Sequence, residues 1–102
     1  MKIVDVIPRV LNAETEPYST YSQKFGTERY SMVVEVQTDE GITGWGESVC
    51  HGAQPGQIAA AYIDSFIRPR LIGRDPFDVE VLWEEMFHGT RPFGGGGAVN
   101  AI

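Results

Sequence analysis

The sequence is poor in the residues that most often define a functional class. It contains one cysteine, Cys50, and two histidines among 102 residues, and its net charge is −6. A single cysteine excludes an internal disulfide framework and is typical of a reducing compartment. The excess of acidic residues leaves no basic cluster to displace counterions from phosphates, so binding to nucleic acid is not expected.

Long apolar runs are also missing. The N-terminal stretch MKIVDVIPRV has Asp5 inside a short apolar run, which is not the pattern of a signal peptide. No later stretch has the length needed to span a bilayer. The sequence therefore predicts a cytoplasmic protein that does not bind a membrane. Its 42% hydrophobic and 22% charged residues predict a single domain with a modest core.

Side chains that could hold a metal ion or catalyse a reaction are few. Cys50, His51 and His88 do not have the spacing of zinc ligands, so no metal site is predicted in this chain. Glu84 and Glu85 are neighbours on a predicted helix, and neighbouring helical residues diverge. We therefore interpret these two carboxylates as part of a solvated face, and no catalytic residue is predicted.

The chain is organised around residues 30–47, which read YSMVVEVQTDEGITGWGE. Apolar and polar residues alternate over residues 30–38, which is typical of a half-buried strand. Asp39 then favours a turn, Gly41 accepts a positive φ, and a second short strand follows at 42–47. The pattern predicts a β-hairpin.

Residues 2–11 are apolar on both faces and predict another strand, in which Pro8 favours a sheet edge or a bulge because it has no N–H to donate. Residues 12–29 predict a long loop, and such a connection is uncommon in a compact domain unless it has a function. Its aromatic residues favour a lid over a surface loop without a function. They are Tyr18, Tyr21 and Phe25.

A second loop at 48–54 leads into a predicted helix over residues 55–68. Apolar residues recur every four positions from Ile58 and from Ala59, which places both rows on one side of the helix. Pro69 is expected to end this helix, because the residue before a proline is disfavoured in the α region.

The second predicted helix covers residues 76–88. Asp75 is a suitable N-cap, and His88 with Gly89 forms the expected stop. Residues 90–97, TRPFGGGG, predict a flexible joint.

The predicted fold class is α+β, with a three-stranded antiparallel sheet followed by packed helices. We interpret Trp45 and Trp83 as core residues rather than ligand platforms. The predicted core comprises Val34, Val36, Ile58, Tyr62, Phe66, Leu82, Trp83 and Met86.

The last residues begin a pattern that they do not complete. Gly94–Gly97 precede a predicted helix, but the Lys-Ser or Lys-Thr of a phosphate-binding loop does not follow, so a hinge is favoured over a phosphate site. Apolar residues then recur over Ala98–Ile102 and predict the start of a helix. We expect the chain to be the N-terminal piece of a longer protein, truncated after Ile102.

Four stretches together resemble a known family. TDEGITGWGE at 38–47, PRLIGRDP at 69–76, Leu82-Trp83 and AVNAI at 98–102 follow the order and approximate spacing of the enolase superfamily. The resemblance is to its mandelate racemase and muconate lactonizing enzyme branch, and it covers nearly the whole chain. It identifies residues 1–102 as an N-terminal capping domain, whose (β/α) barrel is absent from this sequence.

The resemblance implies a division of labour between the two domains. The family's barrel supplies acidic ligands for Mg²⁺ and the lysine or histidine bases that remove a proton next to a substrate carboxylate. None of these positions exists in this chain, so the resemblance implies an enzyme only for the intact protein and no turnover for the 102 residues alone. The implied partners are a small carboxylic acid, the chain's own barrel domain and further copies in a homo-oligomer.

The family also implies which residues approach the substrate. Its first loop and the loop after the third strand fold over the barrel mouth, and His51 is the one residue there that chemistry alone would select, since it titrates near neutrality. A single loop histidine is more often incidental, and the resemblance favours the functional interpretation. The implied substrate-binding residues are Tyr18, Tyr21, Lys24, Phe25, Glu47 and His51.

Several functions stay open on this basis. The polar loops suit a polyhydroxylated acid, which favours an acid-sugar dehydratase over a racemase, epimerase or cycloisomerase of the same superfamily. A free-standing α+β binding module without catalysis is the alternative from another class.

Overall fold

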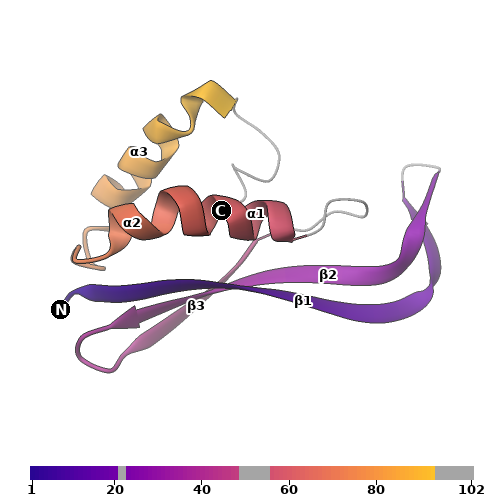
Figure 1. The fold of residues 1–102 in the computed structure, drawn as a ribbon, viewed down its shortest axis with the longest axis horizontal. Coiled ribbons are helices and arrows are strands. Elements are labelled where there is room, and N and C mark those ends of the chain that lie inside the picture. The colour runs from indigo at the N-terminus through magenta and orange to yellow at the C-terminus, as the bar shows by residue number, and fades with distance from the viewer. Residues whose placement is uncertain (21–22, 49–55, 94–102) are drawn as a thin grey trace.

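The computed structural model describes residues 1–20, 23–48 and 56–93 of the chain. It confirms the α+β class, with three strands followed by helices (Figure 1). The strands are β1 (Ile3–Thr20), β2 (Gln23–Thr38) and β3 (Thr43–Ser48), and the helical elements are α1 (Gln57–Tyr62), η1 (Ile63–Ile67), α2 (Arg68–Leu71), α3 (Val79–Gly89) and η2 (Arg91–Phe93).

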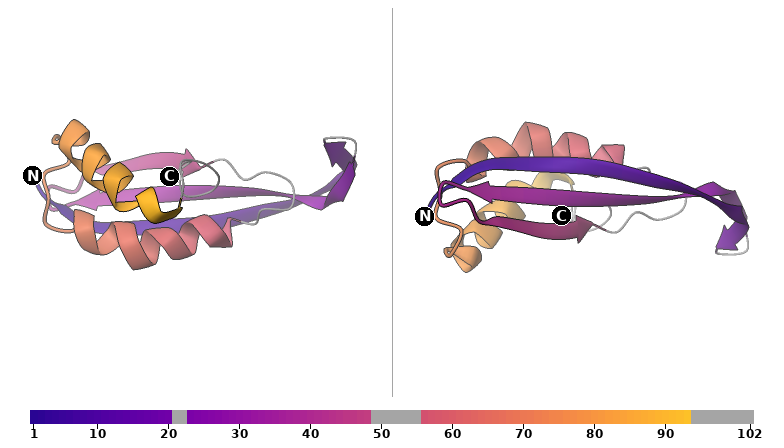
Figure 2. Two further views of the ribbon diagram at one scale, coloured as in Figure 1. Left: turned by 90° about the horizontal axis from the view of Figure 1, so that it is seen from above. Right: turned by 90° about the horizontal axis from the view of Figure 1, so that it is seen from below.

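The strands form one antiparallel sheet in the order β1-β2-β3, so β1 and β3 lie at its edges. Pro8 lies on the edge strand β1, opposite Val34, in the position where a residue without an N–H is tolerated. The prediction for the first strand is confirmed in this respect. Figure 2 shows that the described helices all lie on one face of the sheet and leave the other uncovered.

The prediction of a loop over residues 12–29 is wrong, whereas its role as a lid stays a prediction. β1 and β2 stay paired as far as Thr20 and Gln23, and beyond the end of β3 they form a two-stranded ribbon, here called the arm (residues 11–20 and 23–31). Figure 1 shows the arm extending away from the helices. Backbone pairing of two strands needs no apolar alternation, so this polar sequence carries no strand pattern.

The predicted hairpin between β2 and β3 is confirmed. The Thr38 N–H donates to the carbonyl of Ile42 at 3.0 Å, and the Thr38 hydroxyl donates to the same oxygen at 2.9 Å. Gly41 has φ +77°, a left-handed conformation that a residue with a Cβ rarely adopts. The turn therefore sets the register in which Gln37 pairs with Thr43.

The core lies between the inner face of the sheet and the first helical segment. Val6 from β1, Met32 from β2 and Ile63 from η1 have no solvent-exposed surface. Alternation along the strands places them on the face that the helices cover. The buried apolar residues are Ile3, Val6, Met32, Ala59, Ile63, Ile67, Leu71 and Leu82.

The first helix does not end at Pro69, contrary to the prediction. α1, η1 and α2 follow one another without a break from Gln57 to Leu71, and η1 is a π-helical stretch. The Arg68 N–H bonds the carbonyl of Ile63, five residues back. A proline removes one helical donor and its ring crowds the preceding turn, and the wider π turn just before Pro69 accommodates both.

The second helix, α3, begins at Val79, three residues later than predicted. Asp75 does not cap it, because its carboxylate accepts the N–H of Phe77 at 3.0 Å and its carbonyl accepts the N–H of Asp78 at 3.2 Å. These bonds close a turn before the helix. α3 ends at Gly89 as predicted, but ordered structure continues, since Thr90 is buried in a region predicted as a flexible joint.

Part of the predicted core is confirmed and part is wrong. Leu82 is buried, and Val34, Val36, Tyr62, Phe66 and Met86 pack against the core while half-buried. Ile58 is 52% exposed and Trp83 53%, and Trp45, also interpreted as a core residue, is 62% exposed. The first helix turns the Ala59–Ile63–Ile67 row inward, so the Ile58 row lies toward its flank.

The linker between the two helical segments is fixed by β1. The Ile3 N–H donates to the carbonyl of Arg74, and the Gly73 N–H donates to the carbonyl of Ile3, both at 2.8 Å. Gly73 has φ +84°, a left-handed conformation that a residue with a Cβ rarely adopts. The Arg74 guanidinium then donates to both carboxylate oxygens of Glu85 on α3, at 2.7 and 3.0 Å. This pair holds the pKa of Glu85 below its ordinary value.

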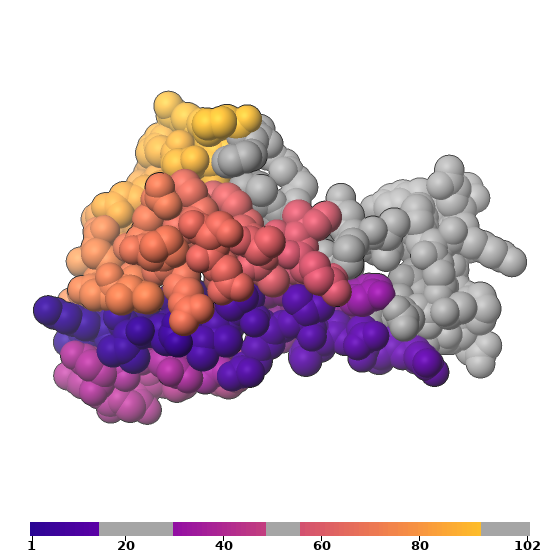
Figure 3. Space-filling view, viewed as in Figure 1, coloured from indigo at the N-terminus to yellow at the C-terminus, as the bar shows by residue number. Residues whose placement is uncertain are grey.

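Figure 3 shows α3 as a ridge raised above the first helical segment, which itself covers the sheet. Among the described helices, none combines the length and the apolar character needed to cross a membrane.

Candidate functional site

The predicted substrate-binding residues fall on two separate parts of the chain. Tyr18 lies in the arm opposite Gly26, and Lys24 lies opposite Ser19, next to Phe25. Tyr21 and His51 lie outside the described residues. Glu47 lies on β3, opposite Val33.

The arm places its end residues well beyond β3. β3 ends at Ser48, which pairs with Met32, and Lys24 lies eight residue steps along β2 from Met32. At about 3.3 Å per strand residue, the path along β2 is about 26 Å. The backbone of Lys24 is therefore far along the sheet from the end of β3, where Glu47 lies.

A pocket of about 250 Å³ lies where the arm meets β3, and we call it the arm-base pocket. Residues of all three strands line it. They are Leu11, Asn12, Ala13, Tyr30, Ser31 and Glu47. Four of these side chains carry hydrogen-bonding groups, so the pocket suits a polar ligand better than an apolar one.

Glu47 is exposed, and its position is fixed by one described hydrogen bond. The Ser31 hydroxyl donates to Glu47 Oε1 at 2.5 Å. Within the described residues the second carboxylate oxygen accepts no hydrogen bond, so it can accept one from a ligand hydroxyl. Of the predicted site residues, Glu47 alone has a described side chain, and it lines a pocket.

A second carboxylate lies on the same outer face of the sheet but is already satisfied. Glu35 accepts hydrogen bonds from Gln37 Nε2 at 2.7 Å and from the Arg9 guanidinium at 2.9 and 2.6 Å. The bond from Gln37 contributes most to holding the pKa of Glu35 below its ordinary value, and Arg9 adds to it. Glu35 is buried by its neighbours, which favours a structural role.

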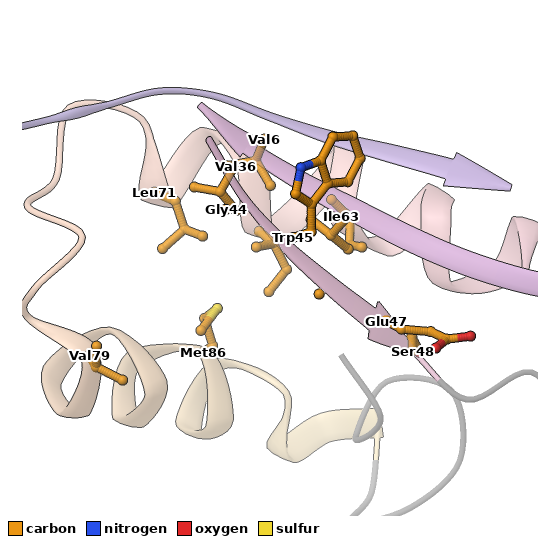
Figure 4. A pocket seen from close by; sticks show the side chains of 13 residues that line it. Val6, Val36, Gly44, Trp45, Glu47, Ser48, Ile63, Leu71, Val79 and Met86 are labelled. Carbon is orange, nitrogen blue, oxygen red and sulfur yellow. The ribbon is translucent and has the colours of Figure 1, made fainter. Parts of the chain in front are cut away.

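A larger, apolar cleft of about 570 Å³ lies between the sheet, the first helix and α3 (Figure 4). Gly44 and Gly46 of β3 form one side, and Met86 and Val79 of α3 form the other. In Figure 4 the Trp45 ring lies on the opposite side of β3 from Met86. The remaining lining residues are Val6, Val34, Val36, Glu47, Ser48, Ile63, Ile67 and Leu71.

The residues with metal-binding chemistry are dispersed. Among residues 1–20, 23–48 and 56–93, no group of three or more His, Cys, Asp or Glu side chains is placed to hold a metal ion. His88 instead contacts Glu84 at 2.8 Å on the exposed side of α3, and Glu85 binds Arg74. Glu84 and Glu85 are both exposed, as predicted, although each has a basic partner.

The sequence reasoning missed Ser31, Asn12 and Tyr30 as pocket residues. The hairpin turn contained the signal for Ser31. Once Gln37 pairs with Thr43, counting back along both strands pairs Val33 with Glu47. Ser31 then lies diagonally across from Glu47 on the same face. Asn12 could not be found, because it lies in a stretch predicted to be a loop, and the pairing of Tyr30 with Asn12 was therefore not expected.

Comparison with known protein families gives one match that covers almost the entire chain. Residues 3–102 match the family described as "Mandelate racemase / muconate lactonizing enzyme, N-terminal domain".

Individual relatives are similar over part or all of this chain. The D-galactonate dehydratase of Verminephrobacter eiseniae (strain EF01-2) is 40% identical over 71 residues, which are 70% of this chain and 18% of that protein. That of Ralstonia pickettii (strain 12J) is 38% identical over 72 residues, again 70% of this chain and 18% of that protein. The chain thus spans less than a fifth of the length of these curated relatives.

Solved structures have the same fold over nearly the whole chain. An enolase-superfamily member from Polaromonas sp. JS666 superposes with a TM-score of 0.81 at 25% identity, covering 97% of this chain and 26% of that one. The 3,6-anhydro-D-galactonate cycloisomerase from Zobellia galactanivorans superposes with a TM-score of 0.76 at 26% identity, covering 97% of this chain and 24% of that one.

Proposed function

Because the chain belongs to the family of mandelate racemase / muconate lactonizing enzyme N-terminal domains, we propose that it is the substrate-capping domain of an enolase-superfamily enzyme. In this proposal residues 1–102 form the cap, and a (β/α) barrel supplies the groups that remove the proton next to a substrate carboxylate. The proposed reaction is the dehydration of an acid sugar.

The curated relatives favour this reaction, since the two described above are D-galactonate dehydratases at 40% and 38% identity. The structural observation that carries the proposal is the Glu47 carboxylate, which Ser31 holds at the edge of the polar arm-base pocket. A fixed carboxylate oxygen accepts hydrogen bonds from hydroxyl groups, and a polyhydroxylated acid presents several of them.

The cap's role would be to bind and enclose the substrate. Glu47 would contact a hydroxyl group remote from the reacting carbon, and the arm, with Tyr18, Tyr21, Lys24 and Phe25, would close over the site and exclude water. His51 would add a second hydrogen-bonding contact. These residue roles stay predictions.

Mg²⁺ belongs to the barrel in this proposal. The described residues of the cap offer no cluster of ligands for it, and no part of the cap's role depends on contact with the metal. Cytoplasmic localisation and a homo-oligomeric assembly also stay predictions.

A cycloisomerase is the second candidate, because one solved relative is a 3,6-anhydro-D-galactonate cycloisomerase. Both candidate substrates are sugar acids, so the arm-base pocket serves either reaction. The product separates them, since a dehydratase releases water from the substrate whereas a cycloisomerase does not.

A chimaeric enzyme tests the proposal. Residues 1–102 would replace the matching N-terminal segment of the Verminephrobacter eiseniae D-galactonate dehydratase, and dehydration of D-galactonate would be measured with Mg²⁺. We expect turnover by the chimaera and none by the 102-residue chain alone, because in this proposal the barrel supplies the base for proton removal. Exchange of a substrate α-proton into deuterated water by the isolated chain would contradict the division of roles.

Two variants of the chimaera test Glu47 itself. We expect Glu47→Gln to lower kcat/KM about ten- to a hundredfold, since it replaces a charged acceptor at a polar contact. Glu40→Gln is the matched control, because Glu40 is an exposed carboxylate on the turn before β3. A folded chimaera that turns over D-galactonate equally well with either substitution would remove Glu47 from the site.

A further inference from the structure

The face of the sheet that the described helices leave uncovered has a regular pattern of side chains (Figure 2). Two rows of three residues cross it from β1 through β2 to β3. The first row is Ile7, Glu35 and Trp45, and the second is Arg9, Val33 and Glu47. Strand alternation places both rows opposite the buried Val6 and Met32, and in Figure 4 the Trp45 ring lies on the opposite side of β3 from Met86. We call these two rows the outer face.

The first row has an apolar side chain at each end and a neutralised charge between them. Trp45 is 62% exposed, and Ile7 at the other end is half-buried. Between them, the Glu35 carboxylate accepts hydrogen bonds from Arg9 Nε and Nη2 and from Gln37 Nε2. A partner can therefore cover the centre of the outer face without leaving Glu35 as a buried, unpaired charge.

The second row has opposite charges at its two ends. Arg9 lies on β1 and Glu47 on β3, with Val33 between them. Within the described residues, Arg9 bonds Glu35 through Nε and Nη2, so its Nη1 hydrogens can be donated to another acceptor. The second Glu47 oxygen is likewise open to a donor. Each carboxylate oxygen accepts more than one hydrogen bond, so Glu47 can accept one from a guanidinium and one from a ligand hydroxyl.

Both rows are complementary to themselves when two copies of the chain face each other. A two-fold axis that runs along β2, between the two outer faces, places β1 of one copy over β3 of the other. Ile7 then faces Trp45 of the second copy, and Arg9 faces Glu47 of the second copy. Each apolar end meets an apolar end and each cation meets a carboxylate, and both contacts occur twice. Sheets that pack in this way lie about 10 Å apart, with their strands about 30° from parallel.

We propose that the outer face is a contact surface for a second copy of this chain, with Trp45 against Ile7 and Glu47 against Arg9. Three strands over residues 5–11 of β1 and their partners form a surface of about 14 by 23 Å. Two such surfaces bury about 650 Å² when flat, which is less than the roughly 1,200 Å² of stable complexes, so the dimer is weak. The inference concerns assembly and does not depend on the proposed enzymatic reaction.

Sedimentation equilibrium of the 102-residue chain, at concentrations up to about 1 mM, tests this directly. We expect a dimer whose population rises with concentration, and Trp45→Asp should weaken it about tenfold or more. Trp83→Asp is the matched control, because Trp83 is similarly exposed but lies on α3, and it should leave the dimer unchanged. Circular dichroism checks that both variants are folded. A chain that stays monomeric throughout, or a dimer lost in Trp83→Asp and kept in Trp45→Asp, would overturn the proposal.

Two charge-reversed chains test how the rows face each other. Glu47→Lys would set cations opposite each other in its own dimer, and Arg9→Glu would set carboxylates opposite each other, so neither chain should dimerise alone. The Arg9→Glu chain also carries Glu35→Gln, so that no buried carboxylate loses its guanidinium. Mixed in equal amounts, the two chains should form a heterodimer about as stable as the unchanged dimer, because each cation again faces a carboxylate. A mixture that stays monomeric while the unchanged chain dimerises would contradict this arrangement.

Discussion

The two long helical segments of this domain bury their apolar residues to very different extents. The segment from α1 to α2 presents one buried row, Ala59, Ile63, Ile67 and Leu71, to the sheet. α3 buries only Leu82 and half-buries Met86, while its remaining large apolar residues are at least 39% exposed. The exposed residues are Val79, Val81, Trp83 and Phe87.

The difference shows where each segment gets its stability. The first segment packs against strands that are part of the chain, so its apolar pattern matches the surface it meets. α3 carries apolar residues on several sides and is attached to the described core by few interactions, chiefly the Arg74–Glu85 pair, Leu82 and the contact of Gly89 with Phe66. Its exposed apolar sides are typical of an interaction surface.

The largest expected contrast is between Ile63 and Trp83. Ile63→Ala removes a fully buried side chain between helix and sheet, and we expect it to lower the free energy of unfolding by about 2–5 kcal/mol. Trp83→Ala removes a larger but half-exposed side chain whose ring stacks on Phe87 at 4.9 Å, and we expect a loss of about 1 kcal/mol or less.

Urea denaturation of both variants, followed by far-ultraviolet circular dichroism, checks this contrast. Ile58→Ala serves as the control on the first helix, because Ile58 is 52% exposed and should behave like Trp83. If Trp83→Ala lowered the free energy of unfolding as much as Ile63→Ala, α3 would be buried in solution, for instance by self-association. That result would contradict the difference between the two segments.

The junction of the two segments is the next test. A Cβ at Gly89 would overlap the Phe66 ring, which stacks on Tyr62 and lies under the Arg70 guanidinium. We expect Gly89→Ala to lower the free energy of unfolding by about 1–3 kcal/mol, because an overpacked contact forces the ring to move. Any gain in helix propensity at Gly89 would offset part of this loss.

A double variant decides whether the Phe66 contact is the cause. Phe66→Leu shortens the side chain, so Gly89→Ala should cost less in that background than in the unchanged chain. The coupling from a double-mutant cycle measures the difference. Equal costs in both backgrounds would contradict a direct contact between α3 and η1.

The elements that the sequence predicted well are those with a local physical signal. The β2–β3 hairpin followed from alternation and from the turn residues Asp39 and Gly41, and the structure confirms it. The end of α3 at Gly89 also followed from local chemistry. Leu82 was predicted as a core residue because apolar spacing on a helix marks the packed face, and it is buried.

The predictions that were wrong have the opposite property, since each depended on contacts between residues that lie far apart in the sequence. The arm is held by pairing between polar strands, which leaves no periodic pattern in residues 12–29. Pro69 was expected to end a helix, but a π turn before it lets the helix continue. Trp45 and Trp83 were interpreted as core residues, although the faces they occupy have no described cover.

The candidate site was only partly visible in the sequence for the same reason. Glu47 was selected, and its side chain lines the arm-base pocket. Ser31, which holds it, required the strand register rather than the composition of the loop.

An arginine ion pair also anchors each helical segment, Arg68 with Asp5 for the first and Arg74 with Glu85 for the second. The Arg68 pair should have a smaller effect on stability than the substitutions above. Arg68 Nη2 lies 2.8 Å from Asp5 Oδ1 on β1, and Arg68 Nη1 lies 3.5 Å from Asp64 Oδ1 on the same helical segment. We expect Arg68→Gln to lower the free energy of unfolding by about 0.2–1 kcal/mol, because partly exposed ion pairs contribute little. Urea denaturation at low and at 1 M salt checks this, since screening should remove most of the difference. A loss that persists unchanged at 1 M salt would mean that Arg68 acts through packing of its stem.

The second ion pair, Arg74 with Glu85, should contribute least to the stability of the domain, and its contribution should depend on pH. The hydrogen bond from Arg74 lowers the pKa of Glu85 in the folded chain. A lowered folded-state pKa means that the contribution is complete above the ordinary glutamate pKa and is lost as the pH falls through the folded-state value.

On acidification, amide protons of α3 should therefore lose protection from hydrogen exchange before those of α1 and η1. In Arg74→Gln this acid-induced loss should be weaker, because the pair is already broken, whereas the control Glu84→Gln should keep it. Equal loss of protection in both helical segments as the pH falls would show that α3 is not the more weakly attached of the two.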